Sequence, residues 1–327
     1  MRLALLLSTL VGLALTGWLL GSVGTAAVWS AVGAIGVGGF ALYVAYTVPV
    51  LLVLGAAWWV VAPGCGAATL PVFAWGRATR EAATDLLPFS QLGGLVVGGR
   101  TVTAAGIPAP LAYASMIADL TTEMASQLVF TLAGVVALLA MVAGGGDEIR
   151  RAAFVGLGLV LATAVALVFA QRPVLALAGQ LLERMVPGSA VALGAVRGEL
   201  DRIYRHRARL LASFALNLLA WLMSGAGAWL ALRLAGHDVP LATVLVVESL
   251  IFALRSAAFM VPGALGIQEG AYVLLMPVFG LPAELGLALS LLKRARDLCI
   301  ALPVLLAWQA QEGGAIWRAR RRVAARD

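Results

Sequence analysis

The sequence predicts an all-α integral membrane protein, a polytopic helical bundle of six to eight spans with two repeat-related, proline-broken (re-entrant) segments. Three observations lead to this fold class, and the first is composition. The 327 residues are 62% hydrophobic and 12% charged, which is about half the charged fraction of a soluble domain. The second is the recurrence of apolar runs of about 20 residues, the length that a helix needs to cross a hydrocarbon core of about 30 Å.

The third observation is an internal repeat of two proline-bounded segments. The first runs from Pro88 to Leu111 and the second from Pro262 to Leu285. The residues that match at a constant offset of 174 positions are Pro88 and Pro262, Gly106 and Gly280, Pro108 and Pro282, Ala109 and Ala283, Leu111 and Leu285, and Ala114 and Ala288. Paired broken hydrophobic segments in corresponding positions of two halves indicate a binding site near the middle of the bilayer.

The first repeat half is expected to cover about residues 1–172. Leu3–Leu20 is longer than the apolar region of a signal peptide, so we interpret it as a retained span. Leu70–Thr84 mixes aromatic and charged residues, which favours a short amphipathic helix at the membrane interface. The broken segment follows it. The other spans expected in this half are Phe40–Val61, Leu111–Val142 and Phe154–Ala170.

The second half, about residues 210–312, follows an amphipathic basic connector at 173–209 and ends in a basic tail at 313–327. We expect these parts to form a single transmembrane domain over residues 1–327. The spans expected here are Leu210–Leu234, Leu241–Phe259 and Ala283–Trp308. The number of crossings stays open, because seven spans would place the basic tail opposite the N-terminus, against the charge bias of membrane proteins.

The net charge of +7 comes from basic clusters that lie between apolar runs. These clusters are Arg77 with Arg80, Arg197 to Arg209, and Arg318 to Arg326. Basic loops favour the cytoplasmic side and contact anionic headgroups. We therefore expect a multi-pass protein of the bacterial cytoplasmic (inner) membrane with a cytoplasmic N-terminus, and no nucleic-acid partner.

The broken segments carry the first set of candidate residues. Helix ends inside a membrane expose backbone N–H groups that attract anions such as a lipid phosphate, and glycine lets a headgroup approach closely. The candidate substrate-binding residues at these two helix starts are Gln91, Gly93, Gly94, Gly266, Gln268, Glu269 and Gly270. The alternative is two kinked spans whose glycines only pack helices, since Gly94 and Gly98 form a small-xxx-small pattern.

Ionisable residues inside apolar runs form the second set. Each such charge costs about 2.5–3.5 kcal/mol at the bilayer centre, so a group of them requires pairing or a hydrated cavity. Glu123 and Asp297 recur at the repeat offset. The residues predicted to serve as a charge relay or as structural pairs are Asp119, Glu123, Arg255, Lys293, Arg294, Arg296 and Asp297. The alternative is that these charges only hold helices together or extend to the interface.

Enzymatic and metal sites find little support in the sequence. The two histidines, His206 and His237, flank spans rather than lie in them, so a nucleophile such as Ser224 has no base at membrane depth. Metal-ligand spacings and phosphate-binding loops are not seen. Cys65 and Cys299 lie in apolar surroundings and predict no disulfide. We expect no catalytic residue, no metal and no cofactor.

Several motifs resemble the flippase-like family named after the transmembrane region of lysylphosphatidylglycerol synthase. They are Phe252-Ala-Leu-Arg-Ser256, Pro262-Gly-Ala-Leu-Gly-Ile-Gln-Glu-Gly-Ala-Tyr272, Leu291-Leu-Lys-Arg-Ala-Arg-Asp297, and Leu86-Leu-Pro-Phe-Ser-Gln-Leu-Gly-Gly94 with Arg100. They are most similar to the hopanoid-biosynthesis-associated branch. The resemblance implies duplicated broken helices and lipid movement between leaflets, and it implies a site at Arg100, Gly266, Glu269 and Gly270.

Our leading hypothesis is a lipid translocase that acts on anionic or polyol-headed membrane lipids. The first alternative is a non-transporting accessory protein that scaffolds enzymes of membrane lipid or hopanoid biosynthesis. The second is a transferase in which Glu123 and Glu269 act on a lipid headgroup. The lipid substrate, the transport direction, the energy coupling and the oligomeric state do not follow from the sequence.

Overall fold

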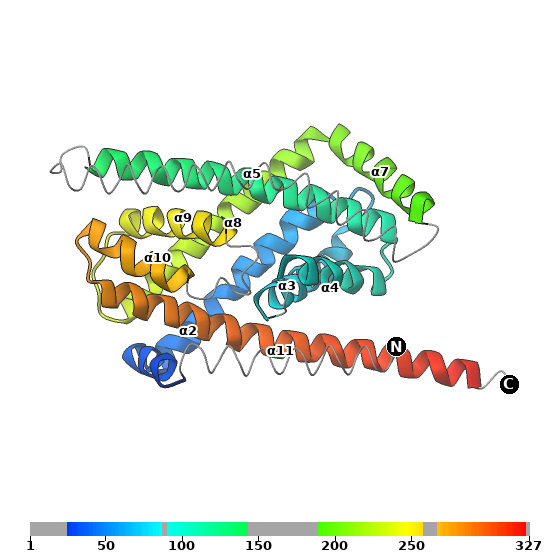
Figure 1. The fold of residues 1–327 in the computed structure, drawn as a ribbon. Helices are drawn as coiled ribbons and strands as arrows, with labels where there is room; N and C mark the ends of the chain where they lie inside the picture. The colour runs from blue at the N-terminus through cyan, green and yellow to red at the C-terminus, as the bar shows by residue number, and fades with distance from the viewer. Residues whose placement is uncertain (1–24, 87–89, 143–188, 258–266, 325–327) are drawn as a thin grey trace.

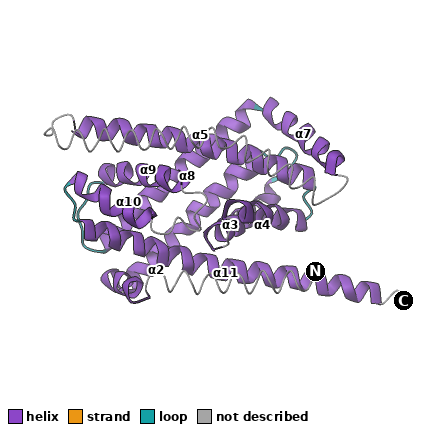
Figure 2. Cartoon of the chain, in the orientation of Figure 1, coloured by secondary structure: helices purple, strands orange, loops and turns teal. Residues whose placement is uncertain are grey.

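The computed structural model describes residues 25–86, 90–142, 189–257 and 267–324, and every regular element within these ranges is helical (Figures 1 and 2). This confirms the all-α class. The helices of the first part are α2 (Thr25–Val60), η1 (Ala67–Thr69), α3 (Leu70–Leu86), α4 (Ser90–Ala104) and α5 (Ala109–Val142). Those of the second part are α7 (Ser189–Arg205), α8 (Arg207–Leu234), α9 (Leu241–Ala257), α10 (Ile267–Leu275), η3 (Met276–Phe279) and α11 (Ala283–Ala324).

Three of the described helices are long and apolar enough to cross a membrane: Gly33–Val60 within α2, Ala109–Ala140 within α5, and Arg207–Leu234, which is α8. They bear out the apolar spans expected at Phe40–Val61, Leu111–Val142 and Leu210–Leu234. Their outer faces carry exposed leucine and valine side chains, which lipid would cover. The spans expected at Leu3–Leu20 and Phe154–Ala170 lie outside the described residues.

The sequence repeat recurs in the positions of the helices. Gly33–Val60 and Arg207–Leu234 both have 28 residues and are displaced by the same 174 positions, as are the starts of α5 and α11. The short helices α4 and α10–η3 both lead into a left-handed glycine, Gly106 with φ 95° and Gly280 with φ 70°. Glycine adopts this conformation without a Cβ penalty, so the chain can reverse before the next long helix.

The long helices α5 and α11 run in opposite directions on two sides of the molecule, with the α3–α4 pair and the α9–α10 pair between them at opposite ends (Figure 1). Helices of each half pack against helices of the other half. α5 contacts α9, α11 contacts α3, and α2 lies against α8. Opposite directions of equivalent long helices are typical of an inverted repeat.

One segment interpretation needs correction, and another is described only in part. Leu70–Thr84 was expected to lie at the membrane interface, but α3 is packed against α2, α4 and α11, and it buries Arg77 and Arg80. The span expected at Leu241–Phe259 is described only as far as Ala257, as α9, because its last two residues lie outside the described residues. α3 precedes α4, and α9 precedes α10, so α3 and α9 are the first helices of the two repeat-related pairs. Their amino-acid compositions differ, so this equivalence is not apparent from the sequence.

Buried charge clusters at the candidate functional site

The first-half cluster consists of Arg77 and Arg80 on α3, Asp119 and Glu123 on α5, and Asn217 on α8. Arg77 Nη1 and Arg80 Nη1 lie 3.2 and 3.0 Å from Asp119 Oδ2. The same two guanidinium groups each place an Nη2 atom 2.5 Å from a Glu123 carboxylate oxygen. Asn217 donates to the other Asp119 oxygen at 3.2 Å. The Asp119 side chain is completely buried, so its charge is balanced entirely by these partners.

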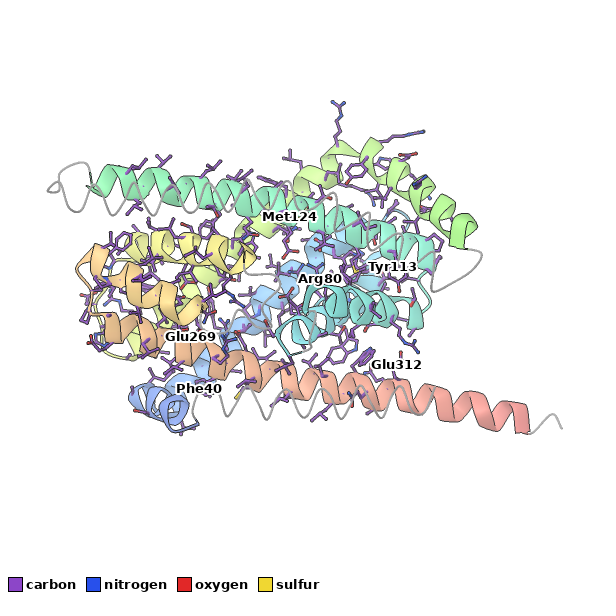
Figure 3. The ribbon with its side chains drawn as sticks, in the orientation of Figure 1. Phe40, Arg80, Tyr113, Met124, Glu269 and Glu312 are labelled. Atoms are coloured by element: carbon purple, nitrogen blue, oxygen red, sulfur yellow. The ribbon has the colours of Figure 1, made fainter. Side chains whose placement is uncertain are left out.

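Helical spacing explains why these four charged residues meet. Asp119 and Glu123 are four residues apart and Arg77 and Arg80 are three apart, so each pair occupies one helix face. The sequence had placed Arg77 and Arg80 in a cytoplasmic basic cluster, and that interpretation was wrong. Three carboxylate oxygens on α5 accept hydrogen bonds from the two arginines inside the protein, and Arg77 also pairs with Glu81 on its own helix at 2.7 Å. Figure 3 labels Arg80 in this region.

The second-half cluster consists of Glu248 on α9, Tyr272 on α10 and Lys293 on α11. Lys293 Nζ lies 2.5 Å from Glu248 Oε2 and 2.8 Å from the Tyr272 hydroxyl oxygen, and the Tyr272 hydroxyl donates to the other Glu248 oxygen. The ammonium group also lies 5.0 Å from the centre of the Phe252 ring, within the range of a cation–π contact. All three side chains of this cluster are buried.

Further charges line α11 beside this cluster. Arg294 pairs with Glu269 at 3.1 Å, and Ser290 links Glu269 to the buried Gln268 amide. Arg296 pairs with the adjacent Asp297 at 2.6 Å. The structure thus brings together the predicted residues Gln268, Glu269, Arg294, Arg296 and Asp297 on or against one helix.

An ion pair joins α3 of the first half to α9 of the second half. Arg255 Nη2 on α9 lies 3.8 Å from Asp85 Oδ1 on α3, and the two side chains are 22% and 27% exposed. This separation is within the range of a salt bridge but too long for a direct hydrogen bond. Asp85 was not among the predicted site residues, although its position three residues before Pro88, where the first repeat segment begins, could have indicated it.

Arg100 lies apart from Glu269. Its guanidinium pairs with Glu312 at 2.7 Å, and its side chain is 55% exposed. Glu312 lies 18 residues beyond Arg294, the partner of Glu269, which is a rise of about 27 Å along α11. Figure 3 labels Glu269, on α10, and Glu312, on α11, at widely separated places. The structure therefore does not bring Arg100 and Glu269 into one site.

The candidate glycines differ in their surroundings. A Cβ atom at Gly94 would lie 2.2 Å from Thr84 Oγ1, and one at Gly98 would lie 2.9 Å from Arg80 Cβ. This close approach of α4 to α3 favours the packing interpretation for Gly94. Nothing lies within 4 Å of a Cβ atom built at Gly270. Gln91 and Gly93 lie in the first turns of α4, and Gly266 lies outside the described residues.

Metal ligands and disulfides are not seen in the described ranges. No group of three or more His, Cys, Asp or Glu side chains there could hold a metal ion. Cys65 and Cys299 are both free thiols. The chemistry that the clusters offer is therefore charge pairing and hydrogen bonding.

Comparison with known families places these clusters in context. Residues 4–305 match the family described as Lysylphosphatidylglycerol synthase TM region. The chain belongs to this family. The match covers both repeat halves and supports a lipid-related integral membrane protein. No curated protein and no solved structure matches the chain.

The residues that sequence reasoning missed are partners of the predicted ones, and they include two acids, Glu248 as the partner of Lys293 and Asp85 as the partner of Arg255. Arg77, Arg80, Tyr272 and Asn217 were not among the candidates. Arg77 and Arg80 could have been recognised from complementary charge, because their spacing places both on one helix face and the two acids of the next long helix have a similar spacing. Tyr272 and Asn217 carried no such signal, since single polar residues in apolar helices have no predictable partner.

Proposed function

We propose that this protein moves polar-headed lipids between the leaflets of the bacterial cytoplasmic membrane. The observation that carries the proposal is the Asp85–Arg255 pair, which joins the two repeat halves and is flanked by the charges of α11. Asp85 and Arg255 are partly exposed, whereas the first-half and second-half clusters on either side are buried. A polar headgroup would therefore meet accessible charge at this junction.

The geometry of the junction supports exchange of partners. Arg255 holds Asp85 at 3.8 Å, without a hydrogen bond between the two groups. A lipid phosphate or polyol could replace Asp85 on Arg255 with shorter, charge-assisted hydrogen bonds. Arg294 could donate to the phosphate, and Glu269 and Asp297 could accept from hydroxyl or ammonium groups of the head, while the apolar body of the lipid stays in the bilayer.

The orientation follows from basic residues at one end of the molecule. The basic helix α7 and the C-terminal end of α11 both lie at the right-hand end in Figure 1. Positive charge favours the cytoplasmic side. We therefore assign this end to the cytoplasm. The resemblance to the hopanoid-associated branch supports a polycyclic isoprenoid lipid with a polyol head as one candidate substrate, beside phospholipids.

The test is a lipid-exchange assay in proteoliposomes with a headgroup-labelled phospholipid. We expect Arg255→Gln and Glu269→Gln to slow exchange about tenfold, the change produced by losing one charge-assisted contact of about 1.4 kcal/mol. Asp85→Asn removes the group that the headgroup displaces from Arg255, so it should not slow exchange in this way. The matched control is Arg233→Gln, because Arg233 also pairs with an aspartate, Asp238, but at an exposed loop.

Equal exchange by the wild type and all four variants would reject the proposed junction. Exchange no faster than in protein-free vesicles would reject transport of that lipid, and a hopanoid-type polyol lipid would be tested next in the same assay. A chemically altered lipid recovered from the vesicles would instead support a headgroup transferase. Co-purification of lipid-biosynthetic enzymes with a protein that shows no exchange would support a scaffold.

A further inference from the structure

A recess at the elbow between α7 and α8 lies apart from both charge clusters. It has a volume of about 500 Å³ and is lined by Asp201, Tyr204, Arg205 and Arg207. The elbow forms because α7 ends at Arg205 and α8 begins at Arg207, with His206 between them in a non-helical conformation. All four lining residues are exposed.

The recess lies where two membrane spans end. The apolar span of α8 begins at Arg207, and α2 ends at Val60. Arg209 donates to the carbonyl of Ala62 at 3.4 Å, which places the end of α2 beside the start of α8. Leu211, one turn into α8, is 67% exposed and faces outward, as a lipid-contacting residue would. The elbow is therefore at the level of lipid headgroups.

The charges that line the recess are available for a ligand. Arg202 pairs with Glu199 at 3.8 Å, but neither Arg205 nor Arg207 forms a salt bridge within the part of the chain that the structure describes. Tyr204 is 43% exposed, and its hydroxyl bonds Thr121 on α5 at 3.3 Å. Two arginines suit a phosphodiester, and an interfacial tyrosine suits the region beneath it. Asp201 adds an acceptor for a donor on the same headgroup.

We propose that this recess binds the headgroup of a membrane phospholipid that carries both a phosphodiester and hydrogen-bond donors, such as phosphatidylglycerol or phosphatidylethanolamine. Arg205 and Arg207 hold the phosphate, and Asp201 accepts from the hydroxyl or ammonium group. The site does not depend on the proposed transport. Its bound lipid stabilises the elbow at the cytoplasmic end of α8.

Native mass spectrometry of the full-length protein in detergent, titrated with phosphatidylglycerol, phosphatidylethanolamine or phosphatidylcholine, tests this site. We expect Arg205→Gln/Arg207→Gln to weaken retention of the first two lipids about tenfold. The matched control is Arg197→Gln/Arg202→Gln, which removes the same charge from α7 outside the recess and should leave retention unchanged. We expect Asp201→Asn to reduce the preference for these two lipids over phosphatidylcholine.

Three outcomes would overturn the proposal. Equal weakening by both double variants would mean that lipid binds by general charge attraction along α7. Displacement of lipid by inorganic phosphate at equal concentration would mean that the recess is a site for free phosphate. Retention of all three lipids by the recess variant at the wild-type level would mean that the recess does not bind headgroups.

Discussion

The first-half and second-half clusters occupy equivalent positions in the repeat, but the long helices carry opposite charge at one position, Asp119 and Lys293, and the same charge at another, Glu123 and Asp297. Asp119 on α5 and Lys293 on α11 are separated by the repeat offset, and so are Glu123 and Asp297. The neighbouring short helix compensates, because α3 supplies arginines while α9 supplies Glu248. Each half thus buries a charge of the long helix together with a partner of opposite sign, and the signs are exchanged between the halves.

The clusters also differ in the number of partners that each charged group has. In the first half two carboxylates share two guanidinium groups, so each charge has more than one partner. In the second half Lys293 has one carboxylate partner and one hydroxyl partner. Removing a charge should therefore cost more in the second half, and the following predictions test this.

The largest effect is expected for Lys293→Met. This change leaves the Glu248 carboxylate buried without a cation, which typically costs about 3–5 kcal/mol of unfolding free energy. Thermal unfolding in detergent should show a markedly lower midpoint. The control Glu248→Gln/Lys293→Met removes both charges and should recover most of the loss. A double variant no more stable than the single one would contradict this explanation.

An intermediate effect is expected for Asp119→Asn. Glu123 still bonds both arginines in this variant, so the loss should be about 1.5–3 kcal/mol, as for one hydrogen bond to a charged group. The same unfolding measurement compares it with Lys293→Met, and Glu123→Gln is a matched change on the same helix face. A loss as large as that of Lys293→Met would show that the first-half cluster is not redundant.

The smallest effects concern the glycines of the two broken pairs. Gly94→Ala should cost about 1–3 kcal/mol, because its methyl group would press on the backbone oxygen of Arg80. Gly270→Ala meets open space in α10 and should be neutral or stabilising by up to about 1 kcal/mol. Thermal midpoints of the two variants would decide this. Equal destabilisation would mean that the second pair is packed as tightly as the first.

The sequence predicted the membrane spans well where apolar runs were long. Leu210–Leu234 and Leu111–Val142 correspond closely to α8 and α5, because 20 or more apolar residues have few other stable places. The interpretation was wrong for the shorter helix α3. α3 contains Arg77, Arg80 and Glu81, and a polar helix of this length has the composition of an interfacial helix until its partners on α5 are known.

The candidate site could be predicted only in part for the same reason. A buried acid such as Asp119 is recognisable, since its apolar neighbours on the helix imply burial. Its partner is not recognisable, because the pairing of α3 with α5 is a long-range contact. Glu269 and Arg100 illustrate the opposite error, since matching motifs suggested a shared site and the length of α11 separates them.

The amino-acid sequence by itself determined that this protein is a helical membrane protein built on an offset of 174 residues. The length of an apolar run and the positions of glycine and proline are local properties of the sequence, and their effects do not depend on contacts between helices. Only the tertiary structure decided which charges neutralise one another, because ion pairing depends on distances of a few ångströms between helices that are remote in sequence. The packing of α5 against α9 and of α11 against α3, each across the two halves, sets those distances.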